Sequence, residues 1–249
     1  MNPPPYLWAY ILYTCLMITG LVLLGIAGAL HRSGVAVERT RAIVRRSAIL
    51  FFGWLGLAAL TGWLGVYRAS ADRDFPFIAL ALGIPITIGV LLIRRSTATR
   101  EVLAAVPQSW LVGVQFYRGL GSVFLLLYGV GLLPGVFALP AGFGDVLVGL
   151  LALVVAACCT REYASRSRLL IAWNILGLVD LAIALGTGFL SAPTKFQVLA
   201  LGNPNQLVGA FPLVLVPIYA VPLSVILHIA SLTKLAWETK PDEPGGSVS

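Results

Sequence analysis

The sequence predicts an all-α, polytopic membrane protein in which seven transmembrane helices form one bundle, with the amino terminus outside and the carboxyl terminus in the cytoplasm. Seven apolar stretches occupy most of the 249 residues, and 59% of the residues are hydrophobic while only 11% are charged. The mean hydropathy of +0.93 exceeds what a soluble core can bury, whereas runs of about 20 apolar residues can each span a bilayer. The basic residues gather in alternate loops, which gives the orientation.

Each predicted helix is an apolar stretch between charged or turn-forming residues. In chain order the stretches cover approximately residues 6–30, 47–67, 76–93, 109–133, 141–160, 169–190 and 207–232. At about 1.5 Å of rise per residue, these lengths match the thickness of a bilayer core. Aromatic residues typical of membrane interfaces support the boundaries, with Trp8 and Trp63 near the predicted outer surface and Trp110 and Trp173 near the inner one.

The basic residues predict the orientation. With the amino terminus outside, the cytoplasmic side holds thirteen of the 17 basic residues: Arg32, Arg39, Arg41, Arg45, Arg46, Arg94, Arg95, Arg100, Arg161, Arg166, Arg168, Lys234 and Lys240. The outer side holds Arg68, Arg73 and Lys195, and Arg118 lies inside the fourth stretch. Because cytoplasmic loops are rich in Lys and Arg, this distribution predicts a cytoplasmic carboxyl terminus. Topology thus explains the net charge of +7 without a nucleic-acid partner.

The segments outside the helices carry further expectations. Residues 97–108 place Val102, Leu103 and Val106 opposite Arg100 and Glu101, which predicts a segment along the cytoplasmic interface. The loop 191–206 contains an apolar run, so we expect it either to cover the mouth of the bundle or to dip into the interface. We expect one transmembrane domain over residues 1–235 and a disordered cytoplasmic tail over residues 236–249, which is polar and turn-rich.

Small residues and prolines indicate where helices come close. In the fifth stretch such positions recur every three or four residues: Gly142, Asp145, Gly149, Ala152 and Ala156. The sixth stretch repeats the pattern with Asn174, Gly177, Asp180, Ala184 and Gly188. Because small residues let another backbone approach, we expect these two helices to pack on each other or to line one cavity. The seventh stretch contains Pro212, Pro217 and Pro222, which predict a kinked helix.

Buried polar residues form the candidate site: Gln115, Arg118, Asp145, Asn174, Asp180 and His228. A charge near the bilayer centre costs at least about 2.5 kcal/mol on insertion scales, so each ionisable group needs a partner or water. Helical rise from the predicted boundaries puts Arg118 level with Asp180, above a second polar layer that contains Gln115, Asn174 and His228. Asp145 is expected to stand apart, roughly 6 Å below the outer surface. Helices four, six and seven would then converge on one polar centre.

Two interpretations of this polar centre remain open from the sequence. In the first, it is a solute or proton pathway in which Arg118 binds an anionic group or keeps Asp180 charged, and Asp180 exchanges a proton. Gln115, Asn174 and His228 then line the inner route. In the second, Arg118 forms a static pair with Asp180 or Asp145, because buried pairs can fix an arrangement without adding stability.

Cofactor and enzyme motifs are incomplete. His31 and His228 lie near the same predicted leaflet and would be the pair to hold a haem, but His31 is an interfacial neighbour of Arg32 and His228 can bond a carbonyl freed by a kink. Two histidines without cysteine or carboxylate at ligand spacing make no catalytic zinc site, and no nucleophile lies beside a histidine at matching depth. We therefore expect no cofactor, no metal and no enzymatic activity.

The resulting expectation is a bacterial inner-membrane protein that acts as a small-solute or proton-coupled carrier. Arginine outnumbers lysine 14 to 3, which is typical of a GC-rich bacterial genome. The expected partners are the lipid bilayer, a small-molecule or proton substrate, and either a membrane-protein partner or a second copy of the chain. The competing class is a non-transporting subunit or assembly partner of another membrane complex, and the third is a membrane-embedded haem or redox protein.

Overall fold

The computed structural model describes residues 4–70, 77–160 and 163–238, and every regular element in these ranges is helical. The chain opens with α1 (Pro5–Arg32), α2 (Val37–Trp63) and α3 (Phe77–Arg95). A short α4 (Thr97–Ala105) precedes a composite helix made of α5 (Gln108–Gly113), η1 (Val114–Ser122) and α6 (Val123–Gly129). Next come α7 (Gly135–Ala157), η2 (Cys158–Thr160) and α8 (Tyr163–Ser191), followed by η3 (Val216–Ala220) and α9 (Val221–Glu238).

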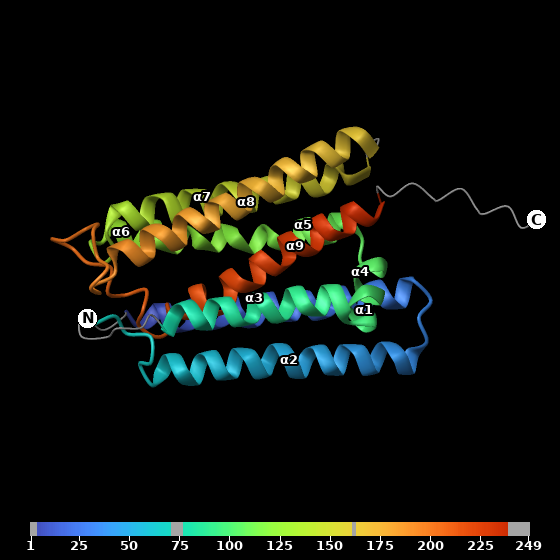
Figure 1. The fold of residues 1–249 in the computed structure, drawn as a ribbon, viewed down its shortest axis with the longest axis horizontal. Helices are drawn as coiled ribbons and strands as arrows, with labels where there is room; N and C mark the ends of the chain where they lie inside the picture. The colour runs from blue at the N-terminus through green and yellow to red at the C-terminus, as the bar shows by residue number, and fades with distance from the viewer. Residues whose placement is uncertain (1–3, 71–76, 161–162, 239–249) are drawn as a thin grey trace, which may run out of the picture.

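Seven helices within the described residues are long and apolar enough to cross a membrane, as the sequence predicts. Their axes are roughly aligned, with α7 and α8 side by side at the top of the view, α2 at the bottom and α9 between them (Figure 1). The helices differ in the buried share of an 18-residue apolar stretch. It is 56% in the last helix, formed by η3 and α9, but only 17% in α2 and 11% in α3. The last helix therefore forms the centre of the bundle, and α2 and α3 lie at its edge.

The loops lie at two opposite ends of the bundle (Figure 1). We call the end formed by residues 64–70, 130–134 and 192–209 the loop end, and the opposite end, where Arg32, Arg94 and Arg100 lie, the basic end. At the loop end the ring of Trp8 packs against those of Trp63 and Phe211, with centroids 5.2 and 4.9 Å apart. The aromatic residues predicted for one interface thus share one end of the bundle, as expected.

Some helix boundaries differ from the prediction, for identifiable reasons. α2 begins at Val37, ten residues before the predicted start, because its arginine-rich first turns are helical although they are not apolar. α7 begins at Gly135 and continues through Pro140. Residues 207–214 are turns and bends and not helix, so the predicted start of the seventh helix was wrong. This stretch is apolar because it is buried: Leu207, Leu213 and Val214 are at most 1% exposed.

Other expectations can be compared directly with the described residues. On α4, Leu103 is buried and Arg100 is exposed, which confirms the two-sided character predicted for this segment. The irregularity expected in the seventh helix is present as the π-helical turn η3, which contains Pro217. α9 continues to Glu238, so the first three residues of the predicted tail are helical, and residues 239–249 lie outside the described residues.

Candidate functional site

Arg118 is the centre of a buried cluster of charges. It projects from η1, and its side chain is 1% exposed. Its Nε donates to Asp145 Oδ1 of α7 at 2.9 Å, and its Nη2 forms an ion pair with Asp180 Oδ2 of α8. Its Nη1 donates to the carbonyl of Gly177 at 3.4 Å. One guanidinium facing two carboxylates leaves this cluster with a net charge of −1 when all three groups are ionised.

The structure confirms the expected proximity of Arg118 and Asp180, but the expectation that Asp145 stands apart was wrong. Asp145 contacts Arg118 directly. The error follows from the start of α7, because a helix that begins at Gly135 puts Asp145 ten residues from its first residue, roughly 15 Å along the axis. Asp145 therefore reaches the depth of the arginine.

A chain of hydrogen bonds continues from Arg118 toward the basic end. His228 Nε2 lies 3.3 Å from Arg118 Nη1, and His228 Nδ1 lies 2.9 Å from Asn174 Oδ1. Arginine can only donate, so Nε2 accepts and the proton of a neutral imidazole sits on Nδ1, from which it bonds to Asn174. Asn174 Nδ2 donates to Ser231 Oγ at 3.0 Å, and Gln108 Nε2 donates to the same oxygen at 2.8 Å. We call His228, Asn174, Ser231 and Gln108 the polar layer.

Gln115 does not join this layer through a hydrogen bond. It is 0% exposed, and neither its amide nitrogen nor its amide oxygen has a hydrogen-bond partner among the described residues. The expected layer of Gln115, Asn174 and His228 is thus formed by Asn174 and His228, which bond to each other. Buried amides are almost always paired, so Gln115 marks a place where the polar centre is incomplete.

The backbone around Arg118 is irregular. η1 is a 3₁₀ helix of nine residues within the fourth apolar helix, although runs beyond three or four residues are uncommon. Gly149 of α7 faces it, and a Cβ there would lie 2.6 Å from the backbone nitrogen of Gly119. The small residues of α7 therefore admit the backbone of η1. The predicted packing of α7 on α8 is present at Gly144, where a Cβ would overlap the carboxylate of Asp180. The predicted face of small residues, with Gly142 and Gly149, instead meets the fourth helix.

Two polar residues were not singled out from the sequence but belong to this centre. Gln108 was assigned to an interfacial segment, yet it is 5% exposed and binds Ser231. Tyr117, beside Arg118, bonds through its hydroxyl to Ser224 Oγ at 2.5 Å. Gln108 lies seven residues before Gln115, and this two-turn spacing on a helix was the available signal.

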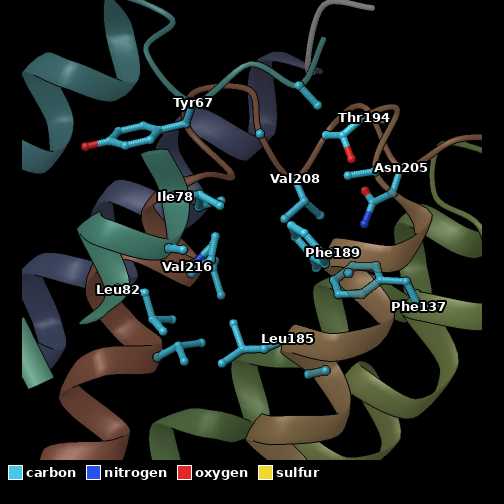
Figure 2. A pocket seen from close by; sticks show the side chains of 18 of the residues that line it. Tyr67, Ile78, Leu82, Phe137, Leu185, Phe189, Thr194, Asn205, Val208 and Val216 are labelled. Carbon is cyan, nitrogen blue, oxygen red and sulfur yellow. The ribbon is translucent and has the colours of Figure 1, made fainter. Parts of the chain in front are cut away.

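A cavity of about 280 Å³ opens beside Asp145. Its walls come from α3, α7, α8, η3 and the loop 192–209, and its side chains are mostly apolar, as Ile78, Leu82, Leu185 and Val216 illustrate (Figure 2). Phe137 and Phe189 add aromatic rings, and Thr194 and Asn205 lie toward the loop end (Figure 2). Asp145, whose side chain is 17% exposed, thus lies between the buried arginine and this cavity. Residues of the loop 191–206, among them Ala192, Thr194 and Phe196, line this cavity.

The hydrogen bonds of His228 can be compared with what a haem ligand would need. Both ring nitrogens of His228 are engaged, one with Asn174 and one with Arg118, so this arrangement leaves neither for an iron ligand. Among the described residues, no three His, Cys, Asp or Glu side chains come close enough to hold a metal ion. His31 is exposed in the last turn of α1.

Seven apolar helices of this length are characteristic of a multi-pass membrane protein, and the charged cluster lies inside their bundle. The chain belongs to the family described as "Domain of unknown function (DUF8737)", whose model matches residues 75–236. This range begins before α3 and ends within α9, so it includes every residue of the charged cluster and the polar layer. Searches of curated proteins and of solved structures gave no match.

Proposed function

We propose that this protein is a proton-coupled carrier for a small solute. The observation that carries the proposal is the unequal charge of the buried cluster, in which Arg118 faces both Asp145 and Asp180. A net charge of −1 in an apolar bundle is costly, and a proton or a cationic solute removes it. An intramembrane ionisable group that borders a cavity is a candidate for proton or solute exchange, and Asp145 borders one.

The two sides of the cluster differ in a way that suits alternating access. On the loop-end side, Asp145 adjoins the cavity. On the other side, the polar layer and the packed cluster of Val112, Leu170 and Trp173 separate Arg118 from the basic end. This asymmetry is what one state of a carrier requires, with the site open toward one end and sealed toward the other. In the opposite state, the hydrogen bonds of the polar layer would open.

Protonation supplies a driving step. A proton that enters through the cavity binds a carboxylate oxygen of Asp145 or Asp180, and the cluster becomes neutral. The neutral cluster can expose itself toward the basic end at a lower electrostatic cost and release the proton there. The irregular segments η1 and η3 are the proposed hinges, because 3₁₀ and π turns within long helices accompany functional movement.

The proposed orientation puts the loop end outside and the basic end in the cytoplasm of a bacterium, in its inner membrane. The described residues Arg32, Arg94, Arg95 and Arg100 gather at the basic end, and basic residues favour the cytoplasmic side. In this orientation the cavity would face the periplasm, and inward transport would follow the proton gradient.

Thiol accessibility tests the carrier. In a background without Cys15, Cys158 and Cys159, a single cysteine is placed either at Ala184, on the cavity wall, or at Ser231, in the polar layer. A membrane-impermeant thiol reagent is applied to either side of oriented vesicles at several pH values. We expect Ala184→Cys to react from the loop-end side. We expect Ser231→Cys to react from the basic-end side, at a rate that changes with pH.

The control is a cysteine on the outer face of the bundle. Leu24→Cys, at a position 71% exposed on α1, should face lipid and react from neither side. If Ser231→Cys stays unreactive at every pH in a protein that elutes as a folded species, the cluster is a static pair and the carrier proposal fails.

The competing function is a non-transporting subunit of a larger membrane complex. The observation that favours it is the low burial of α3. Only 11% of its apolar stretch is buried by the rest of the chain. Such a helix contacts either lipid or another protein. Copurification of one partner in a fixed ratio, together with an unreactive Ser231→Cys, would support this function in place of the carrier.

A further inference from the structure

The cavity beside Asp145 has polar groups at two separated points of an otherwise apolar wall. Along α8 the wall extends from Leu181 to Phe189, roughly 12 Å at the helical rise. Asp145 lies at the deep end, level with Asp180, which precedes Leu181 in the chain. Asn205 lies at the mouth, where its backbone nitrogen donates to the carbonyl of Ser191 at 2.8 Å. The distance between the two points sets the length of molecule that can touch both.

Asn205 provides a polar group without an internal partner. It is 2% exposed, yet neither atom of its side-chain amide has a hydrogen-bond partner among the described residues. Figure 2 places this side chain on the cavity wall, beside Thr194 and Phe189. A buried amide is rarely left unpaired, because it has lost its hydrogen bonds to water and gains none from the protein. A ligand in the cavity can supply the missing hydrogen bond.

The deep end favours positive charge. The cluster of Arg118, Asp145 and Asp180 has one more carboxylate than guanidinium, and Asp145 is the member with 17% side-chain exposure at the cavity. The rings of Phe137 and Phe189 also line the wall, and aromatic faces attract cations. Arg68 borders the same cavity, but its side chain is exposed at the mouth, where water and salt screen it.

We propose that this cavity binds a lipophilic amine. Its ammonium group faces Asp145, its apolar body lies between α3 and α8, and a hydroxyl, amide or carbonyl group at its other end bonds to Asn205. The inference rests on the proposed carrier function, because it names the class of solute that the carrier takes. Its test measures binding alone, so the two can fail separately.

The test compares matched probes that share one apolar body. Phenylhexylamine, phenylhexanol and phenylhexanoate carry a cationic, neutral or anionic end, and hydroxyphenylhexylamine adds a hydroxyl at the far end. Equilibrium binding is measured with the full chain in lipid nanodiscs, and partition into empty nanodiscs is subtracted. We expect the amine to bind roughly tenfold to a hundredfold more tightly than the alcohol, and the acid to bind most weakly.

Two substitutions locate the probe. Asp145→Asn should abolish the preference for the amine over the alcohol, so that the two probes bind with similar affinity. Saturable binding of the alcohol then shows that the cavity is folded. Asn205→Leu should remove the additional affinity, about two- to tenfold, that the far hydroxyl gives in the natural protein. The matched control is Glu101→Gln, at a carboxylate that pairs with Arg39 away from the cavity, and it should change neither preference.

A cavity-filling variant keeps the test decisive if Asp145→Asn does not fold. Ala184→Phe fills the cavity from a position that is not a member of the charged cluster, and it should abolish binding of every probe. Equal affinities for the amine and the alcohol, tighter binding of the acid, or no saturable binding would each overturn the inference. If no probe binds but Ser231→Cys reacts in a pH-dependent way, the inferred amine site is wrong and the proposed carrier function is still supported. If the amine binds but Ser231→Cys never reacts, the inferred amine site is supported and the proposed carrier function fails.

Discussion

Removal of Arg118 should destabilise the bundle far more than removal of either carboxylate. Arg118→Met leaves two carboxylates without the guanidinium that each of them contacts, in a site where the arginine side chain is only 1% exposed. Loss of one partner from a buried ion pair costs about 3–5 kcal/mol. Asp145→Asn or Asp180→Asn instead leaves one guanidinium and one carboxylate, which balance, and an amide oxygen that still accepts a hydrogen bond. We expect each of these to cost about 1 kcal/mol.

The free energy of unfolding in mixed micelles, measured by titration with a denaturing detergent, gives these values. The triple variant that combines Arg118→Met, Asp145→Asn and Asp180→Asn should recover most of the loss, since neutral replacements of a whole buried charge set are often tolerated. Arg39→Met is the control, because its ion pair with Glu101 is exposed and should contribute less than about 1 kcal/mol. The reasoning fails if Arg118→Met costs no more than Asp180→Asn, or if the triple variant is as unstable as Arg118→Met.

Three further predictions concern packing and polar pairing. Gly144→Ala should lower stability by about 1–3 kcal/mol, because the new methyl group overlaps a carboxylate of the cluster, whereas Gly186→Ala on α8, with open space around it, should be tolerated in the same unfolding assay. Gln115→Leu should leave stability unchanged or raise it, since the amide has no partner among the described residues; a loss above about 1 kcal/mol would reveal one. His228→Leu should cost about 1–3 kcal/mol, because it leaves the side-chain oxygen of Asn174 unpaired, and an unchanged unfolding midpoint would contradict the bond between them.

Part of the site could be predicted because the depth of a side chain in the bundle follows from the rise per residue along its helix. Arg118 and Asp180 were placed level from their distances along two helices, and the ion pair confirms this. The same arithmetic failed for Asp145, because α7 starts at Gly135 and not after Pro140. A shift of six residues in a boundary moves a side chain by about 9 Å, which decides whether it reaches a partner.

Other features had no signal in the local sequence. Residues 207–214 are mostly apolar, like a transmembrane helix, but they form turns. Hydropathy reports the burial of a segment and not its conformation. The 3₁₀ segment η1 lies where Gly149 of α7 closely approaches its backbone, a contact between two different helices. Asn205 is one polar residue of the loop 191–206 in the sequence, and only the fold places its amide on a cavity wall without a partner among the described residues.

The sequence by itself determined the seven apolar helices and the buried polar residues, because apolarity, length and charge belong to each segment separately. The tertiary structure alone decided that Arg118 holds two carboxylates, that Gln115 and Asn205 lack partners among the described residues, and that a cavity adjoins Asp145. The physical reason is that hydrogen bonds and ion pairs act over about 3 Å. Whether two polar groups are that close depends on how helices far apart in the chain pack together.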